Sequence, residues 1–321
     1  MNSRAALTLV AVLALLTSGC TGDDSGASGP PGSSGSSAPS PSESSLFTLT
    51  PVTLPPEPPP SGKLKADIEQ SSRDGAAGRF QVWVDNDTDT LITPTRVTYT
   101  DARFRTPLTG TRLRDIPSQA RRGFQFLLPG RPACGREADG GTVTVDYTVD
   151  GDRRTATVPV EDEADVIQRT AAARCLELSI DSIAKLSWAD EVTADGDGGE
   201  GSVGTMTLVV DTTGRRGPTL VIDTIAGNPV LSPGDLGVYD AHLTVRGDDP
   251  PQRVAVPLRP TRCDAHAFGE SGSFAAFALN VHVDGQAGQF ILRMGPTAAA
   301  SALEYAKASC GFLTSIGGGE G

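Results

Sequence analysis

The sequence contains few of the residues from which catalytic and metal sites are usually built. Its 321 residues include three histidines, five cysteines and two tryptophans, and aromatic residues make up 5% of the chain. No two cysteines have the CxxC spacing of zinc or thioredoxin-like sites. Glycine-rich phosphate loops and βαβ alternation are also missing, which excludes solute-binding and nucleotide-enzyme folds. So few aromatic residues leave no visible platform for sugar stacking.

Positive charge is scarce as well. The formal net charge is −12 and the pI is near 4.7, and no cluster of Lys and Arg is evident along the sequence. Nucleic acids and anionic lipid surfaces select basic patches. We therefore predict that the protein binds no nucleic acid, and we interpret its acidity mainly as a source of solubility.

The first residues have the pattern of a signal peptide. Met1–Arg4 carries one positive charge, Ala5–Leu16 is apolar apart from Thr8, and Thr17–Gly19 are small residues that a peptidase can accept. The apolar segment is shorter than the roughly 20 residues that a transmembrane helix needs. The pattern predicts secretion with removal of residues 1–19.

The segment Leu16-Thr17-Ser18-Gly19-Cys20 resembles the lipobox of bacterial lipoproteins. In that family the cysteine receives a diacylglyceryl group and becomes the new N-terminus after cleavage. Thr17 departs from the pattern, because the family more often has Leu three residues before the cysteine. Together with the Ser- and Pro-rich stretch that follows, the resemblance is to surface lipoproteins of actinobacterial type. It implies lipidation of Cys20, palmitate-type acyl chains, and an anchor on the outer face of the cytoplasmic membrane.

The remaining chain divides by composition. Residues 20–61 are rich in Ser, Gly and Pro with little to bury, which predicts a disordered stalk behind the lipidated cysteine. A flexible tail is expected at 313–321. Between them, alternating apolar residues separated by turn signals at short spacing are typical of β-sandwiches. The clearest predicted strands of the first part are 64–68, 79–84, 95–99, 123–128, 143–149 and 153–160.

An internal repeat is the most specific pattern in the chain. Val84-Asp85 precedes Cys134 by 50 residues, and Val210-Asp211 precedes Cys263 by 53. The same correspondence holds further on, where a Val-Asp-Gly turn lies 24 residues before Cys175 in one copy and 25 before Cys310 in the other. The fold predicted is mainly β, with two tandem immunoglobulin-like β-sandwich domains at 62–175 and 176–312. Each ends in a short helix and contains one internal disulfide.

The cysteine count supports this division. If Cys20 is lipidated, the other four pair in an oxidising compartment, and three connectivities are possible. We expect Cys134–Cys175 and Cys263–Cys310, because each pair lies within one repeat.

Two helices are expected to carry the second cysteine of each pair. The first begins at the carboxylates of 161–163 and places Ile167, Ala171 and Cys175 on one face; Leu176–Ile180 then starts the next strand. The second helix covers 297–309. Its predicted apolar stripe consists of Ala299, Leu303, Ala306 and Cys310.

Several weaker motifs are also present. Asp85–Asp89 has the carboxylate spacing of a calcium loop but lacks its Gly and Glu, and a hairpin turn is the favoured interpretation. The acidic, Gly-rich segment 190–204 contains nothing to pack, and we interpret it as a mobile loop. Asp195, Asp197 and Glu200 within it form a second calcium candidate, for which a solvated loop is again the favoured interpretation. Gly269–Gly272 contains Ser271 in a context faintly like that of serine proteases, and we interpret it as a turn.

The three histidines, His242, His266 and His282, all fall in the second repeat. With Asp264 or Asp284 they could build a zinc or copper site. An exposed position on a strand is the favoured interpretation of His282, and no catalytic residue, cofactor or metal ligand is assigned.

Three functions remain open. The favoured one is a noncatalytic module, anchored to the membrane through lipid, that binds a protein or a cell-envelope partner. The alternatives are a metal-dependent surface enzyme that uses the histidines of the second repeat, and a passive structural spacer.

Overall fold

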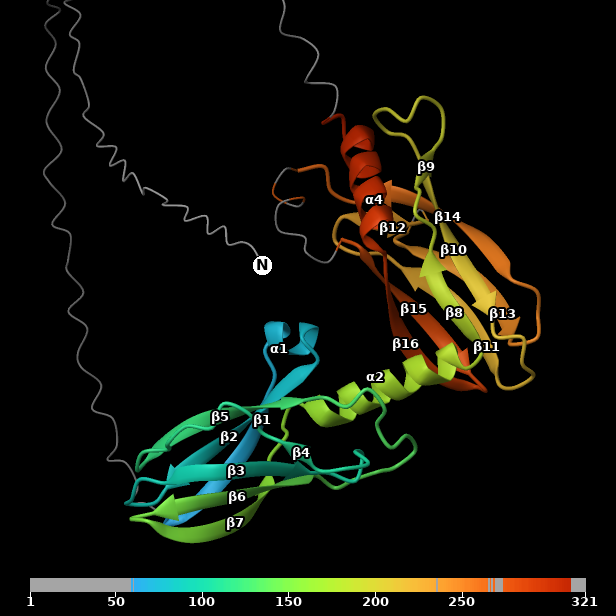
Figure 1. Ribbon diagram of the computed structural model, residues 1–321. Helices are drawn as coiled ribbons and strands as arrows, with labels where there is room; N and C mark the ends of the chain where they lie inside the picture. Colours follow the sequence, from blue (N-terminus) through green and yellow to red (C-terminus); the bar gives the residue numbers. More distant parts are fainter. Residues whose placement is uncertain are drawn as a thin grey trace, which may run out of the picture. The chain divides into compact units, whose positions relative to one another are not determined.

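The structure is a computed structural model that describes residues 59, 61–234, 236–264, 266, 268 and 274–312 (Figure 1). The predicted signal peptide, Cys20, nearly all of the stalk, the predicted tail and Ser271 lie outside the described residues. The fold is mainly β with antiparallel sheets. Among the described residues, no helix is long and apolar enough to cross a membrane.

The first half folds into two antiparallel sheets. One has the strand order β1-β2-β5 and the other β4-β3-β6-β7. The strands of the first sheet are β1 (Lys63–Glu69), β2 (Arg79–Asp87) and β5 (Ala120–Leu127). The strands of the second are β3 (Thr93–Thr100), β4 (Leu108–Thr109), β6 (Gly141–Val149) and β7 (Asp152–Val160). A short helix, α1 (Ser72–Ala76), connects β1 to β2.

Alternating burial holds these sheets together. In β2, Phe80, Val82 and Val84 are fully buried, whereas the residues between them point to the other face. Phe80 packs against Tyr99 and Phe126 at centroid distances of 5.4 Å, so both sheets contribute to one aromatic core. The two-residue period of the sequence therefore decides which side chains are left on the outer face of each sheet.

The second half repeats this organisation. One of its sheets has the order β12-β14-β10-β8, with β9 paired to β10, and the other has the order β13-β11-β15-β16. The first contains β8 (Ala184–Trp188), β9 (Thr193–Ala194), β10 (Gly204–Thr212), β12 (Leu231–Pro233) and β14 (Gln252–Pro260). The second contains β11 (Thr219–Ala226), β13 (Val238–Arg246), β15 (Ala276–Val283) and β16 (Gln286–Arg293).

Strand order relates the two halves. The path β1-β2-β5 corresponds to β8-β10-β14, and β3-β6-β7 corresponds to β11-β15-β16. Each half is followed by a helix, α2 (Val166–Asp181) or α4 (Pro296–Ser309). Asp85 and Asp211, which mark the repeat in the sequence, lie on the equivalent strands β2 and β10.

Helix α2 differs from the prediction at both ends. The expected strand at Leu176–Ile180 is wrong, because α2 continues without a break to Asp181. Three apolar residues at every second position can be read as a strand, but neither Gly nor Pro interrupts the helix there. Ile167 is buried in the first core and Ile180 in the second, so one helix contributes to both.

The start of α2 lies beyond the predicted carboxylates. The backbone of Glu161 instead bonds to Ala66 and Ile68 of β1. The side chain of Asp162 accepts hydrogen bonds from the amides of Val166 and Ile167, at 2.8 and 2.9 Å. A carboxylate at this end satisfies free amides and complements the helix dipole.

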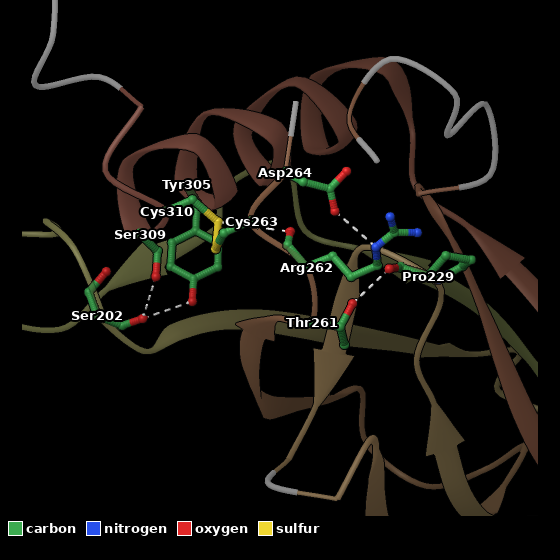
Figure 2. The surroundings of a disulfide bond; sticks show 9 residues. All are labelled: Ser202, Pro229, Thr261, Arg262, Cys263, Asp264, Tyr305, Ser309 and Cys310. Atoms are coloured by element: carbon green, nitrogen blue, oxygen red, sulfur yellow. Dashed lines mark hydrogen bonds and ion pairs between the residues drawn. A yellow bond between two sulfur atoms is a disulfide. The ribbon is translucent and has the colours of Figure 1, made fainter. Parts of the chain in front are cut away.

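The predicted stripe of α4 is also largely wrong. The buried residues are Ala298, Ala302, Tyr305, Ala306 and Ser309, and only Ala306 was expected among them. An alanine-rich helix gives little contrast between its faces, so Tyr305 decides the orientation. Its hydroxyl donates to the carbonyl of Leu258 at 2.6 Å and accepts from the amide of Gly204 at 2.8 Å. Figure 2 shows this tyrosine beside Ser202 and Ser309.

Candidate functional site

Two disulfides join corresponding parts of the two halves. Cys134, between β5 and β6, is bonded to Cys175 on α2; Cys263, between β14 and β15, is bonded to Cys310 at the end of α4 (Figure 2). This is the pairing expected from the sequence. Each bond fixes the connection between two strands to the helix that follows, and disulfides of this kind are typical of proteins outside the cytoplasm.

A buried ion pair lies close to the first disulfide. Arg103 donates two hydrogen bonds to Asp101, at 2.8 and 2.7 Å, and a third to Gln168 on α2. The hydroxyl of Tyr99 donates to the same carboxylate at 3.0 Å. Burial raises the pKa of Asp101, but the hydrogen bonds and charge of Arg103 outweigh burial and leave that pKa below its usual value. Since each member is bonded, the network is structural.

The histidines are not brought together as a metal site. His242 is an exposed residue of β13, and His282 on β15 pairs with Asp223 at 2.7 Å. His282 keeps a 41% exposed side chain, in line with the outward position expected of it. Among the described residues, no group of three or more His, Cys, Asp or Glu side chains could hold a metal ion.

The segment Asp85–Asp89 is not a hairpin turn, contrary to the favoured interpretation. Its first part belongs to β2, and the chain then crosses to β3 in the other sheet. Asn86 is buried, and its amide group donates to the carbonyls of Thr90, Ile116 and Pro117 at 2.7 to 3.0 Å. The segment is therefore a crossover held by an asparagine, which carboxylate spacing cannot reveal.

The second acidic segment packs more than expected. Thr193–Ala194 forms β9, Val192 is buried, and the amide of Val192 donates to the hydroxyl of Ser301 at 2.9 Å. The carboxylates of Asp195 and Asp197 accept backbone amides of the same loop. The interpretation of 190–204 as a loop with nothing to pack is thus wrong for this part.

A candidate binding site lies on the outer face of the β1-β2-β5 sheet. It is a groove of about 420 Å³, which we call the Trp83 groove. Its floor comes from β2 and β5, where Trp83 is paired with Gly123 and Gln81 with Gln125. Its wall is formed by Arg112, Arg114 and Asp115, with Arg122 beside the floor.

Local structure positions both parts of the groove. Because Phe80, Val82 and Val84 are buried, the pleat of β2 places Gln81 and Trp83 outward. The wall is held at both ends, since Thr111 bridges to Gln125 and Ile116 bridges to Ile92. Ile116 is fully buried, which ties the wall to the first core.

Two buried hydrogen-bond donors of β2 have no partner on this face. They are Nε1 of Trp83 and Nε of Arg79, and none of the described residues accepts from either. The third such atom in the described part of the chain is Oγ of Ser202, in the second half. A buried donor without an acceptor costs about 1–3 kcal/mol. Of these two residues only Trp83 lines the groove, and a ligand there reaches its Nε1 once the side chains that cover this atom shift.

Arginine dominates the charge around the groove. Neither Arg112 nor Arg114 forms an ion pair with any residue that the structure describes, and both are exposed. Arg121 lies over the Trp83 ring, with Cζ 4.7 Å from the centroid, but is paired with Asp67 at 2.8 Å. The guanidinium groups of the wall, together with that of Arg122 beside the floor, can therefore bind an anion with paired hydrogen bonds.

The expectation that basic residues do not cluster is wrong. Residues 102–136 contain eight arginines, no lysine and a single carboxylate, Asp115, within a chain of net charge −12. Counting charges in a window of this length would have revealed the cluster. The groove itself could not have been found that way, since it requires the pairing of β2 with β5.

The groove also offers acceptors. Nε2 of Gln81 donates to Asp74 at 3.0 Å, which leaves its Oε1 at the floor, over Gly123. Asp115 adds an exposed carboxylate at the wall. The groove therefore presents both acceptors and cationic donors to a ligand.

The second half does not repeat these residues. Counting from Asp85 and Asp211, the position of Trp83 is occupied by Val209, and the strand opposite has Arg253 in place of Gly123. The Trp83 groove is thus a property of the first half, and the second half serves as an internal comparison.

Comparisons with known proteins leave the family open. No protein-family model matches the chain, and no curated protein matches it. Solved structures match at low identity. The calcium binding domain CBD12 of CALX1.1 is 13% identical, with a TM-score of 0.18, 70% of this chain covered and 78% of that one. The BSP domain of a biofilm associated protein is 8% identical, with a TM-score of 0.17, 72% of this chain covered and 58% of that one. The function must be inferred from the site itself.

Proposed function

We propose that the chain is a lipid-anchored, noncatalytic binding module of the extracytoplasmic side of the membrane, and that its envelope partner binds in the Trp83 groove. One observation carries the proposal. The unpartnered donor Nε1 of Trp83 and the unpaired arginines of the wall, Arg112 and Arg114, belong to residues that line one groove. Buried polar groups are normally satisfied in a folded protein, so an unpartnered donor beside free guanidinium groups favours a ligand.

The location follows from the cysteines. Two disulfides suit an oxidising compartment. The lipobox-like residues up to Cys20 and the stalk behind it then hold the folded part at the membrane. Several acyl chains are needed for stable anchoring, which a diacylglyceryl cysteine supplies.

The noncatalytic role is supported by the chemistry of the groove. Its side chains are amides, guanidiniums, an indole and one carboxylate. This set binds acceptors and hydroxyls, whereas acid–base catalysis normally uses a positioned pair of titratable groups with matched pKa values.

Each half is proposed to be an immunoglobulin-like sandwich. Support comes from two facing sheets in each half, with sequence-distant strands β1, β2 and β5 in one and β3, β6 and β7 in the other. In this fold, outer sheet faces and end loops are free to bind while the core remains unchanged.

The proposal is tested by capture from solubilised envelope with full-length protein on a support. Wild type is compared with Trp83→Ala/Arg114→Ala and with the control Arg153→Ala/Arg154→Ala, whose exposed arginines lie on β7. Material retained by wild type and by the control, and lost with the groove variant, supports the proposal. Equal retention by all three, with equal melting temperatures, contradicts it and favours a passive spacer.

A further inference from the structure

The Trp83 groove is more selective than a basic patch. A basic patch offers donors alone, and any polyanion satisfies it. Here Oε1 of Gln81 and the carboxylate of Asp115 lie among the donors. A ligand that carries only anionic groups would meet repulsion at Asp115 and would leave Gln81 Oε1 without a donor. A ligand that presents hydroxyl groups as well as negative charge therefore fits the groove better than a simple polyanion.

The shape of the floor adds a second requirement. Gly123 removes the side chain opposite Trp83, so the indole ring lies across the strand pair and takes part in the floor. Arg121 lies over the ring, and the part of the ring that lines the groove can contact the C–H groups of a sugar. The neighbouring amide of Gln125 can bind the hydroxyls of that sugar. Arg112 and Arg114 then stand where a charged substituent would project toward the wall.

From these features we infer that the ligand of the Trp83 groove is an anionic polysaccharide. The inference rests on the proposed function and names the chemistry of its partner. The sugar hydroxyls bind Gln81, Gln125 and Asp115, and the C–H groups of the sugar contact the part of Trp83 that lines the groove. Its carboxylate or phosphate groups bind Arg112 and Arg114, whose planar guanidiniums suit either anion.

The arginine content of the segment supports the same ligand. All eight basic residues of 102–136 are arginines. Arginine makes paired hydrogen bonds to planar and tetrahedral oxyanions, whereas lysine acts as a point charge. Three of these arginines, Arg112, Arg114 and Arg122, line the groove, and their charge can attract a negatively charged polymer to an otherwise acidic protein.

Binding of defined polymers to full-length protein in detergent tests the inference. The probes are polygalacturonate, which carries carboxylates; phosphomannan, which carries phosphates; neutral dextran; poly-L-glutamate; and a single-stranded DNA oligomer. We expect at least one acidic polysaccharide to bind about tenfold more tightly than dextran and poly-L-glutamate, a difference of about 1.4 kcal/mol. The acidic polysaccharide that binds more tightly identifies the anionic group.

Variants assign the binding to the groove. Trp83→Ala should weaken binding of the acidic polysaccharide about tenfold, measured well below the melting temperature of the variant, whereas Arg154→Ala should have no effect on binding. Poly-L-glutamate or DNA bound as tightly as the polysaccharides would show recognition by charge alone and overturn the inference. If no polysaccharide binds but capture from envelope still depends on the groove, the inference of a sugar ligand is wrong, while the proposed binding function stands. If wild type and the groove variant retain the same material in the capture experiment, the proposed function itself is wrong.

Discussion

Gly123 lies opposite Trp83 in the β2–β5 ladder, and a Cβ atom at position 123 would stand 2.9 Å from Cε2 of the indole and 2.6 Å from Oε1 of Gln81. The glycine is therefore required by the neighbouring side chains. The backbone would also accept alanine if the ring were absent, because no positive φ is recorded there.

This relationship predicts the effect of Gly123→Ala. The added methyl group should displace the Trp83 ring, shift its fluorescence and weaken ligand binding, with a loss of stability of about 1–3 kcal/mol. Gly217→Ala is the matched control, since its Cβ would meet nothing within 4 Å. Fluorescence spectra and denaturant titrations measure both effects. An unchanged spectrum with native affinity would show that the floor does not depend on this glycine.

The buried pair of Asp101 and Arg103 predicts an acid-dependent loss of stability. The pKa of Asp101 is lowered in the folded state. The stabilisation is thus fully present above the unfolded pKa of about 3.9 and is lost as the pH falls through the lower folded value. Thermal melting between pH 7 and pH 2 measures this loss.

Substitution of the same pair gives a sharper result. Asp101→Asn leaves the buried guanidinium of Arg103 without its counterion and should cost about 3–5 kcal/mol. Asp248→Asn, which breaks the exposed pair with Arg216, should cost less than about 1 kcal/mol. Equal effects of the two substitutions would mean that Asp101 does not stabilise the core.

The two disulfides should contribute similar amounts to the free energy of unfolding. Their sequence separations are 41 and 47 residues, and each closed loop contributes about 4 kcal/mol in the chain-entropy model. The Cys134→Ala/Cys175→Ala and Cys263→Ala/Cys310→Ala variants should each melt several degrees lower than wild type. Calorimetry checks this, and an unchanged melting temperature in either variant contradicts it.

If the protein is anchored through Cys20, substitution of this cysteine should change the cell fraction in which the protein is found. Cys20→Ala should remove the acyl thioether, so the protein should leave the membrane fraction or keep residues 1–19. Mass spectrometry of the N-terminal peptide measures both the acyl chains and the cleavage. A wild-type peptide that starts elsewhere, or that carries no added mass at Cys20, would exclude lipidation.

Much of the β architecture could be predicted from local pattern. Alternation in β2 assigned Phe80, Val82 and Val84 to one face, and the spacing of Cys134 and Cys175 within one repeat gave their pairing. Both depend on residues close in sequence or on a repeated landmark, which is why a single sequence is sufficient.

The features that were missed depend on distant residues. Helix α2 continues through Leu176–Ile180 because Ile180 is buried in the second core, which a five-residue pattern cannot show. Tyr305 faces inward because Gly204 and Leu258, far away in sequence, satisfy its hydroxyl. The Trp83 groove likewise exists only once β5 is paired with β2.

The most direct test of the central claim is photo-crosslinking in intact cells. A benzophenone amino acid replaces Leu113, between the two wall arginines, or Arg154 on the exposed part of β7. The account predicts crosslinked envelope material from position 113 that is lost when Trp83→Ala is added, and none from position 154. Crosslinks from position 154 alone, or from position 113 regardless of Trp83, would contradict it.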